Sequence, residues 1–419
     1  MRPSLNNICY AQSGGSTAVI NASASGLIQA ALANEYIGKV FVAQNGILGV
    51  LNEELIDMEY ENEATILGLA HTPGSAFGSC RHKLSSTDNV ELKRIFEVFK
   101  AHNIGFFFYN GGNDSQDTIL KIANYAEKIN YPLNCIGIPK TIDNDLPITD
   151  NCPGYASSAK FLATITQEII LELKGMSRTS TQVFVLEVMG RHSGWLAAAC
   201  GYTAHSSNLS PHIILFPEIT FNPDTFIKAV EKTVKKMGYC MIVTAEGIKD
   251  KTGSLLCKSK NTDAFGHHQL GGIAPNLANL IQQQLGYANH WAVPDYIQRS
   301  SRHLAAAVDV KQAISLGENA LERALNGESN IMLTIERLNN KPYQWKIGSS
   351  QLSNVANQEK CLPPEFIRPD GYGITSACLD YLRPLITGET FPPFSDGLPN
   401  YIQLQSKLCA KKLNAVTLL

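Results

Sequence analysis

The chain lacks the patterns that mark several large classes of protein. None of its ten cysteines forms a Cys-x-x-Cys pair within 419 residues, which argues against a disulfide framework and against a zinc site. The sequence shows neither a charged-then-apolar leader pattern nor an apolar run long enough to cross a bilayer. Its 35 basic and 37 acidic residues are mixed along the chain, without the basic stripe of nucleic-acid or membrane binders. We therefore expect a cytoplasmic enzyme with neither nucleic acid nor membrane as a partner.

Two familiar nucleotide-binding signatures are missing as well. The glycine pair Gly14-Gly15 follows the first apolar run, but no Gly-Lys-Ser or Gly-Lys-Thr comes after it, so it is not a Walker loop. The glycines also lack the spacing of a dinucleotide-binding fingerprint. The pair is therefore only a weak candidate for a phosphate-binding turn of another kind.

What the chain does contain, up to about residue 335, is an alternation of short apolar runs with longer helical patterns. This alternation is typical of an α/β fold with parallel sheets covered on both faces, whose ligands bind beyond the carboxyl ends of the strands. The tail from about residue 339 has two proline pairs and one helical pattern over 374–385, and we expect it to cap the core. The expected strands are 7–11, 39–44, 104–109, 135–139, 183–188, 212–216 and 240–245, and the expected helices include 18–32, 91–102, 116–129, 156–174 and 224–237.

The loop Gly111–Ser115 follows one of these expected strands and contains an unexpected acid. Its two glycines let the backbone approach a phosphate closely, and a helix starting at Ser115 would offer its positive end to an anion. Asp114 does not suit a pure phosphate cradle, because like charges repel. The loop therefore predicts phosphate binding with a restriction on the donor.

Loops after other strands carry residues suited to phosphoryl transfer, which needs positioning and charge neutralisation. Asp143 is the best candidate for the base that accepts a proton from an attacking hydroxyl, although Asn144 and Asp145 leave open that the segment is only a turn. Arg191 and Arg299 are candidates for binding a sugar phosphate. A further acid, Glu246, could accept hydrogen bonds from sugar hydroxyls.

Seven segments, in this order along the chain, resemble the motifs of the phosphofructokinase family. The similarity runs from the N-terminus to about residue 335, with a further echo at Asp380–Leu385. The segments are Ser13–Gly15, Gly78–Arg81, Gly111–Ser115, Pro139–Asp145, Glu187–Gly194, Ala245–Gly247 and Tyr296–Arg299.

The resemblance implies a fold of two Rossmann-like α/β domains, with mainly parallel sheets and the active site in the cleft between them. The implied donor-side domain is 1–147, completed by part of 260–340, and the sugar-side domain is 148–260. Residues 340–419 would form a C-terminal extension packed on the core. The implied reaction is reversible, Mg²⁺-dependent phosphoryl transfer to the 1-hydroxyl of fructose 6-phosphate, carried out by a homodimer or a higher homo-oligomer.

The matching positions carry roles over from the family. Asp143 corresponds to the proton acceptor, Gly14 to a donor-phosphate contact and Arg81 to an arginine that steadies the transferred group. Asn113 stands where the family places a magnesium-associated side chain, usually an aspartate in ATP users, and an amide oxygen can still serve a hard cation. The sugar-phosphate contacts correspond to Thr141, Ile142, Asp143, Met189, Gly190, Arg191, Glu246, Tyr296, Ile297, Gln298 and Arg299.

The choice of phosphoryl donor depends on Asp114 and Lys140. ATP users of the family have glycine at both positions, whereas the pyrophosphate-dependent branch has aspartate and lysine, as this chain does. A carboxylate at Asp114 would occupy the space and charge of a nucleotide α-phosphate, and Lys140 could neutralise it and still reach pyrophosphate. The alternative is a structural ion pair that has no bearing on the donor.

Some features depart from the family pattern or leave alternatives open. His290 and Gln182 replace arginines that serve the sugar-phosphate site between subunits, and serines at 300 and 301 replace the usual glycines. His192 is expected to be a local hydrogen-bonding partner, and His267-His268 a surface or turn pair. The alternatives to a pyrophosphate-dependent enzyme are an ATP-dependent 6-phosphofructokinase and a non-catalytic regulatory subunit of the same fold.

Overall fold

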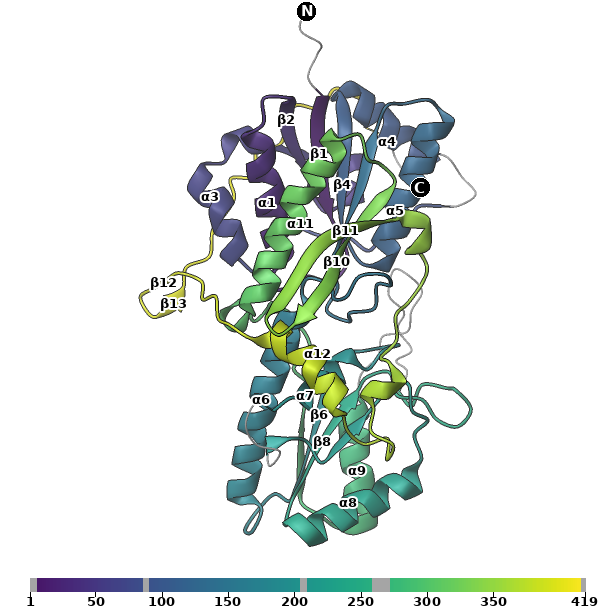
Figure 1. The fold of residues 1–419 in the computed structure, drawn as a ribbon, viewed down its shortest axis with the longest axis vertical. Helices are drawn as coiled ribbons and strands as arrows, with labels where there is room; N and C mark the ends of the chain where they lie inside the picture. Colours follow the sequence, from purple (N-terminus) through teal and green to yellow (C-terminus); the bar gives the residue numbers. More distant parts are fainter. Residues whose placement is uncertain (1–5, 86–89, 204–208, 258–271, 416–419) are drawn as a thin grey trace, which may run out of the picture.

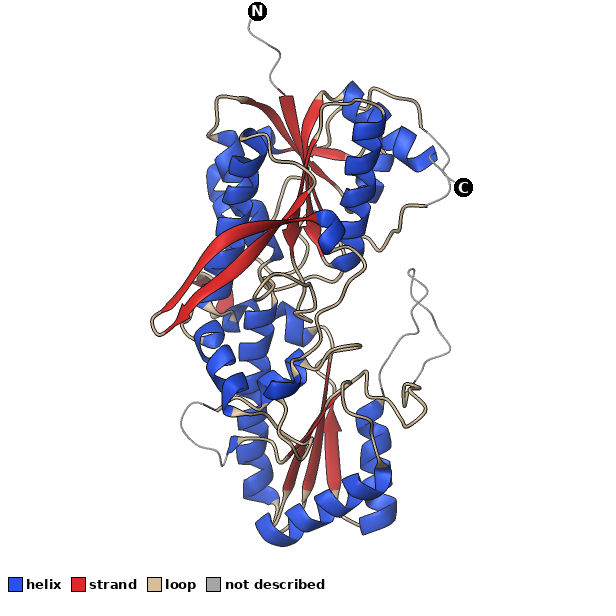
Figure 2. Cartoon of the chain, turned by 45° about the vertical axis from the view of Figure 1, so that its right-hand side comes forward, coloured by secondary structure: helices blue, strands red, loops and turns tan. Residues whose placement is uncertain are grey.

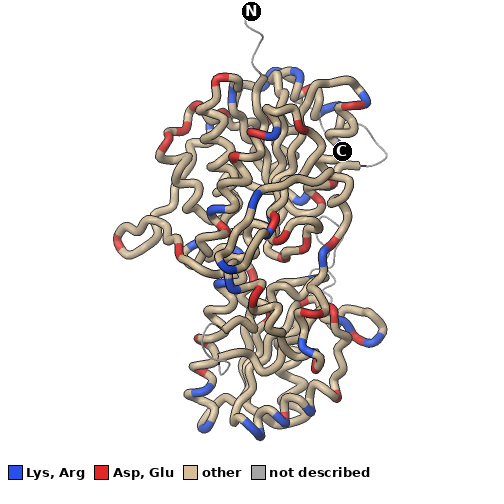
Figure 3. Tube along the Cα trace, in the orientation of Figure 1, with Lys and Arg blue, Asp and Glu red and all other residues tan. Residues whose placement is uncertain are grey.

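The computed structural model describes residues 6–85, 90–203, 209–257 and 272–415. These residues form two α/β units, which lie one above the other in Figure 1. Lysine, arginine, aspartate and glutamate are spread over both units (Figure 3). No helix in the described ranges is long and apolar enough to cross a membrane.

The upper unit is built on a seven-stranded sheet in the order β11-β10-β5-β4-β1-β2-β3. The central strands pair in parallel, and an antiparallel strand, β3 or β11, closes each edge. Successive side chains of β1 enter opposite cores, as the period of a strand requires: Ile8 and Tyr10 on one face, Cys9 and Ala11 on the other. The strands are β1 (Asn6–Gln12), β2 (Ile37–Ala43), β3 (Leu55–Asp57), β4 (Ile104–Gly111), β5 (Asn134–Pro139), β10 (Ile331–Asn340) and β11 (Tyr343–Gln351).

Helices cover both faces of this sheet (Figure 2). On one face α1 (Ile20–Leu32) packs against α11 (Ala307–Leu325), and on the other α4 (Val90–Ala101) and α5 (Asn113–Lys128) pack together with β4. The helices α1 and α11 meet at Gly26 and Gly317, which leave no room for a side chain between them. A Cβ atom on Gly26 would lie 2.3 Å from the carbonyl oxygen of Ile314.

The lower unit is built on a parallel four-stranded sheet in the order β7-β8-β6-β9. Its strands are β6 (Val183–Val188), β7 (Ile213–Leu215), β8 (Cys240–Ala245) and β9 (Asn289–Ala292). One face packs on α6 (Tyr155–Met176) and α7 (Trp195–Cys200), and the other on α8 (Pro223–Met237) and α9 (Ile273–Leu285). The helix α8 has clear ends, since the Asn222 side chain accepts hydrogen bonds from two N–H groups of its first turn and Gly238 ends it in a left-handed conformation.

The C-terminal part of the chain returns across both units. After β11 it passes near the junction of the units, forms α12 (Ser376–Ile386) against α6 and α11, and then runs along the upper unit. There Leu408 bridges to Ile56 of β3, and Glu53 accepts the backbone N–H groups of Lys412 and Leu413. The remaining short elements are α2 (Ile47–Leu51), α3 (Glu63–Gly68), α10 (Ile297–Ser300), β12 (Phe394–Ser395), β13 (Leu398–Pro399), and 3-10 turns at Met58–Tyr60, Leu69–His71, Arg302–Leu304, Leu352–Asn354 and Pro364–Phe366.

The predicted fold class is confirmed, with differences at particular elements. The helix α5 begins at Asn113, two residues before the expected start at Ser115. Residue 340, expected to open the C-terminal extension, is the last residue of β10, and β11 continues the same sheet. The sequence does not predict β11, because this edge strand consists of polar and half-exposed residues that form no apolar run. The His267-His268 pair lies outside the described residues.

Candidate active site

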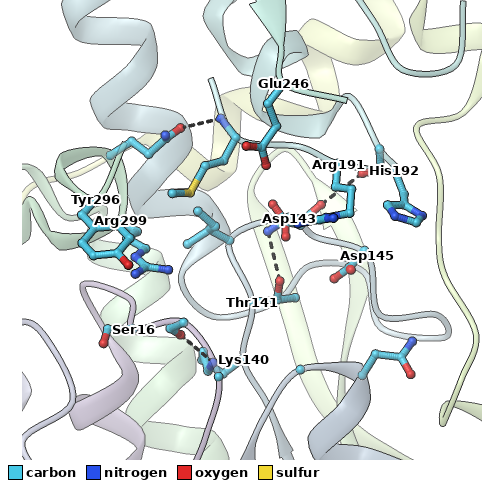
Figure 4. A pocket seen from close by; sticks show the side chains of 18 of the residues that line it. Ser16, Lys140, Thr141, Asp143, Asp145, Arg191, His192, Glu246, Tyr296 and Arg299 are labelled. Atoms are coloured by element: carbon cyan, nitrogen blue, oxygen red, sulfur yellow. Dashed lines mark hydrogen bonds between the residues drawn. The ribbon is translucent and has the colours of Figure 1, made fainter. Parts of the chain in front are cut away.

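A cavity of about 740 Å³ lies between loops of the two units. Its walls come from the residues that follow β1, β4, β5, β6 and β8, together with the turn that leads into α10. Parallel sheets bring the carboxyl ends of their strands to one edge, where ligands bind. Side chains from both units point into this space (Figure 4).

All but two of the residues predicted for the site line the cavity. The exceptions are Gly190, whose N–H donates to Glu246 Oε1 at 3.4 Å, and Ile297, whose side chain is 59 % exposed. Burial raises the pKa of Glu246, which faces the cavity from the end of β8. The predicted residues in the wall are Gly14, Arg81, Asn113, Asp114, Lys140, Thr141, Ile142, Asp143, Met189, Arg191, Glu246, Tyr296, Gln298 and Arg299.

The two glycine loops are joined side by side. The hydroxyls of Ser13 and Ser115 are 3.0 Å apart and share a hydrogen bond, and Gly14 has a φ of +79°, a conformation that favours glycine. A Cβ atom on Gly111 would lie 2.0 Å from Ser115 Oγ, so that position has no room for a side chain. Because α5 starts at Asn113, the N–H groups of Asn113 and Asp114 precede the first backbone hydrogen bonds of the helix, which Ser115 and Gln116 donate to Gly112. These two N–H groups can bind an anion.

Three cations gather at these loops. Lys140 is 2 % exposed, and its Nζ donates to the carbonyl oxygens of Ser13 and Gly15, each at 2.7 Å. Burial, together with the positive charges of Arg299 and Arg81, lowers the pKa of Lys140 to about 7. The Arg299 guanidinium lies so close to the loop that a Cβ atom on Gly15 would be 2.5 Å from it. The arrangement suits a highly charged anion that would relieve this repulsion.

The expected contact between Lys140 and Asp114 is not found in the described part of the chain. The Nζ of Lys140 is held instead by the carbonyl oxygens of Ser13 and Gly15. The cation nearest to Asp114 is instead Lys83, at 3.9 Å, and both of these side chains are exposed. The carboxylate of Asp114 therefore stands at the start of α5 without an ion pair to Lys140.

Asp143 has the surroundings of a general base. Its N–H donates to Thr141 Oγ1 at 3.1 Å, and its carbonyl oxygen accepts from Ser193 Oγ at 3.3 Å. Burial and the negative charges of Asp145 and Glu246 raise the pKa of Asp143. A carboxylate with a raised pKa takes up a proton more readily, which is the property that a base for a sugar hydroxyl needs.

The turn in this segment is made by Asn144, next to the candidate base Asp143. Asn144 has a φ of +55°; its Oδ1 accepts from the N–H of Cys152 and its Nδ2 donates to the hydroxyl of Tyr381, both at 3.0 Å. The turn leaves Asp143 in the cavity wall, where the Arg191 side chain points toward it (Figure 4). Tyr381 belongs to the C-terminal motif at Asp380–Leu385, which therefore supports the loop that carries Asp143.

Two residues predicted to contact the sugar phosphate, Gln298 and Arg299, have partners within the protein. Gln298 accepts the N–H of Met189 at 3.1 Å and donates to the carbonyl oxygen of Asp295 at 3.0 Å, so its amide orients the loops that meet at this wall. The Arg299 guanidinium lies 4.0 Å from the ring centre of Tyr296, a cation–π contact. Arg299 therefore spans from Tyr296 to the glycine loop at Gly15.

The predicted metal position, Asn113, is engaged by other parts of the chain. Its Oδ1 accepts the N–H of Asn357 at 2.6 Å, and its Nδ2 donates to the carbonyl oxygen of Gln358. Among the described residues no group of three or more His, Cys, Asp or Glu side chains is arranged to hold a metal ion. Asp145, however, lines the cavity with an Oδ1 that is buried and has no hydrogen-bond partner in the described ranges. One such carboxylate oxygen fits Mg²⁺, which commonly binds through one or two carboxylates plus substrate phosphates.

The sequence profile of the family described as Phosphofructokinase matches residues 7–324. The chain belongs to the phosphofructokinase family. It is 53 % identical over 411 residues to the pyrophosphate–fructose 6-phosphate 1-phosphotransferase of Halomonas elongata, covering 97 % of this chain and 98 % of the relative. It is 50 % identical over 414 residues to the enzyme of that name from Methylococcus capsulatus, with 98 % of each chain covered.

Solved structures of phosphofructokinases agree with this membership. The crystal structure of a pyrophosphate-dependent phosphofructokinase from Marinobacter aquaeolei is 51 % identical, with a TM-score of 0.91 over 99 % of this chain and 100 % of that one. A phosphofructokinase from Saccharomyces cerevisiae is 20 % identical, with a TM-score of 0.65 over 83 % of this chain and 45 % of that one, and so shares the fold.

Sequence reasoning missed some of the wall of this phosphofructokinase site. Glu359 lines the cavity from beyond residue 324, and its carboxylate is 3.1 Å from Nδ1 of His192, also in the wall. No motif could have indicated Glu359, because its place depends on a return of the chain after β11. The family departures His290 and Gln182 are not part of the wall that the described residues form.

Proposed function

We propose that this phosphofructokinase transfers a phosphoryl group reversibly from diphosphate to the 1-hydroxyl of fructose 6-phosphate. The products are fructose 1,6-bisphosphate and phosphate, a step of glycolysis and gluconeogenesis. One observation carries the choice of donor: the carboxylate of Asp114 stands at the opening turn of α5, beside a glycine loop backed by the buried Lys140. Relatives about half identical over almost the whole chain bear the name of this activity.

The proposed roles follow from charge and position. The N–H groups at the start of α5 and the cations Lys140, Arg81 and Arg299 bind diphosphate and offset the charge that spreads over the phosphoryl oxygens during transfer. Asp143 accepts the proton of the sugar 1-hydroxyl, and Arg191 keeps that carboxylate oriented. In this arrangement the protein contributes positioning and electrostatics more than covalent chemistry.

The sugar phosphate is proposed to bind along the wall made by the β6 and β8 loops and the turn before α10. Glu246 accepts hydrogen bonds from sugar hydroxyls, and Arg191, Met189 and the Tyr296–Arg299 segment bind the rest of the sugar phosphate. The described residues also support a role for Mg²⁺, with Asp145 and Asp114, which both line the cavity, as the carboxylates that would hold it. When bound, Mg²⁺ supplies positive charge that neutralises phosphate oxygens.

We also propose that the protein works as a homo-oligomer in the cytoplasm. The edge strand β9 and the residues after it expose large apolar side chains beside the cavity, which is typical of a surface covered by a partner. These side chains are Trp291, Val293, Tyr296 and Ile297.

All ten cysteines, which lie within the described ranges, are free thiols, as expected in a reducing compartment. Light scattering after size-exclusion chromatography gives the mass; a monomer at assay concentration would refute the oligomer.

A donor comparison tests the function. The purified chain is given fructose 6-phosphate, Mg²⁺ and either diphosphate or ATP, and fructose 1,6-bisphosphate is measured. We expect product from diphosphate and little from ATP. Product from ATP alone would favour the ATP-dependent alternative, and no product from either donor would favour a non-catalytic subunit.

A further inference from the structure

A short segment from the C-terminal part of the chain crosses between the two units beside the cavity. Residues 357–362, called the strap below, follow β11 and the turn Leu352–Asn354. They lie outside the range 7–324 matched by the family profile, and no motif of the sequence marks them. At Asn357 the backbone takes a φ of +60°, which aims the strap at the start of α5.

On the donor side, the strap holds the first turn of α5. The side-chain amide of Asn113 is bonded at both ends, since its Oδ1 accepts the N–H of Asn357 at 2.6 Å and its Nδ2 donates to the carbonyl oxygen of Gln358. Asn357 Nδ2 also donates to Asp117 Oδ1 at 2.9 Å, one turn further along the helix. The next residue after Asn113 is Asp114, so these contacts fix the turn that carries the donor-selecting carboxylate.

In the middle, the strap holds the loop of the general base. The N–H of Lys360 donates to the carbonyl oxygen of Asp145 at 2.6 Å. Its Nζ, mostly buried, donates to the carbonyl oxygens of Thr149 and Asp150, each at 2.9 Å. These bonds are made to backbone groups, so they restrain the path of the loop that carries Asp143.

On the sugar side, the strap holds the loop between β6 and α7. Glu359 pairs with His192 at 3.1 Å, and both side chains line the cavity. One oxygen of Glu218 accepts the N–H groups of both Leu362 and Gly194, at 3.0 and 2.9 Å, which ties the end of the strap to the start of α7. A single stretch of six residues therefore touches the donor turn, the base loop and the sugar loop.

We propose that the strap is part of the active site and that Asn357 and Glu359 are positioning residues, Asn357 for diphosphate and Glu359 for the sugar phosphate. Phosphoryl transfer depends on holding donor, acceptor and base in one geometry, and small displacements are costly. Asn357 acts through Asn113 and the first turn of α5, and Glu359 acts through His192 and the β6–α7 loop. The inference rests on the proposed function for the identity of the two ligands.

Two variants test the two ends of the strap independently. Asn357→Gly keeps the left-handed backbone and removes the bond to Asp117, so KM for diphosphate should rise about threefold to tenfold while KM for fructose 6-phosphate changes less than about twofold. Glu359→Gln removes the charge facing His192 and should show the reverse split. The matched control is Glu365→Gln, the same change at an exposed position three residues after the strap and outside the cavity wall, and it should leave both KM values unchanged.

Two further measurements, the Mg²⁺ dependence of the rate and the melting temperature, distinguish a positioning role from metal binding and from a general loss of stability. The Mg²⁺ concentration for half-maximal rate should stay that of the parent in Asn357→Gly and also in Asn113→Ala; a rise in Asn113→Ala alone would make Asn113 a metal ligand and overturn the strap reading at that end. The melting temperature should change little, and Glu359→Asp should restore part of the sugar-phosphate affinity. Equal shifts of both KM values in each variant, or no shift in either, would overturn the proposal.

Calorimetric binding of diphosphate and fructose 6-phosphate to the same proteins separates this test from that of the proposed function. If ATP proves to be the donor, the proposed function fails, yet a selective loss of fructose 6-phosphate binding in Glu359→Gln would still support the sugar end of the strap. If the parent turns over diphosphate and the variants bind both ligands as the parent does, the function stands and the strap proposal fails.

Discussion

Binding of diphosphate should be coupled to uptake of a proton by Lys140. Burial and two neighbouring arginines lower the pKa of this lysine from 10.5 to about 7 in the free protein. A bound anion with several negative charges stabilises the ammonium form and raises the pKa again. Between the free and the bound pKa values, each binding event must therefore bring a proton to Lys140.

The size of the effect follows from the free pKa. At pH 8 about nine-tenths of the lysines are neutral before binding, and at pH 6 about one-tenth are, so the lysine takes up about 0.9 and about 0.1 proton per site. The same linkage weakens diphosphate binding about tenfold at pH 8 relative to pH 6. The affinity falls as pH rises, because the charged form of the lysine is the one that binds.

Isothermal titration calorimetry in two buffers of different ionisation enthalpy measures this uptake. Diphosphate and Asp143 also titrate, so the matched reference is Lys140→Met, whose unbranched side chain is one atom shorter and has no ammonium group. The measured quantity is the proton uptake of the parent minus that of Lys140→Met. We expect this difference to be about 0.8 proton per site larger at pH 8 than at pH 6. Equal uptake by the parent and Lys140→Met at pH 8 would refute the coupling.

Three further substitutions test other parts of the site. Asp143→Asn should lower kcat by about 10²–10⁴-fold, the usual contribution of a general base, and a near-normal kcat in a steady-state assay would remove Asp143 from that role. Asp114→Gly combined with Lys140→Gly should weaken the use of diphosphate and allow some ATP to bind; calorimetry that detects no nucleotide binding would mean that other residues exclude it. Gly15→Ala should displace the Arg299 guanidinium, 2.5 Å from the new Cβ atom, and lower kcat/KM about tenfold with a nearly unchanged melting temperature. Parent kinetics in that variant would show that Arg299 can move without loss.

The sequence was sufficient for the parts of the site that depend on local pattern and topology. Glycine, acid and arginine clusters stood directly after apolar runs, and a parallel sheet must bring such positions to one edge. Asp143 and Arg191 were placed together in this way, although they are far apart along the chain. The same logic identified the α/β class without any three-dimensional information.

The features that sequence reasoning missed depend on side-chain direction or on long-range returns of the chain. Lys140 was expected to meet Asp114, but hydrogen bonds to two carbonyl oxygens direct its ammonium elsewhere, and no sequence pattern encodes that rotamer. Asn113 meets Asn357 across 244 positions of sequence, through a segment with no periodicity. Edge strands such as β11 are half-exposed and therefore read as ordinary polar sequence.

The strand order of the upper sheet has a consequence for biosynthesis. Its inner strand β5 pairs with β10, and β10 and β11 are made only after the sheet of the lower unit and the helices α6 to α9 have been translated. A nascent chain that ends before residue 331 has β5 as an open edge, and before residue 307 it also lacks α11 against α1. The lower unit, all of whose strands lie between residues 183 and 292, can fold on the ribosome first, since domains generally fold as units. The catalytic cavity therefore forms late, once β10 and β11 have completed the upper sheet and the chain after them has packed on both units.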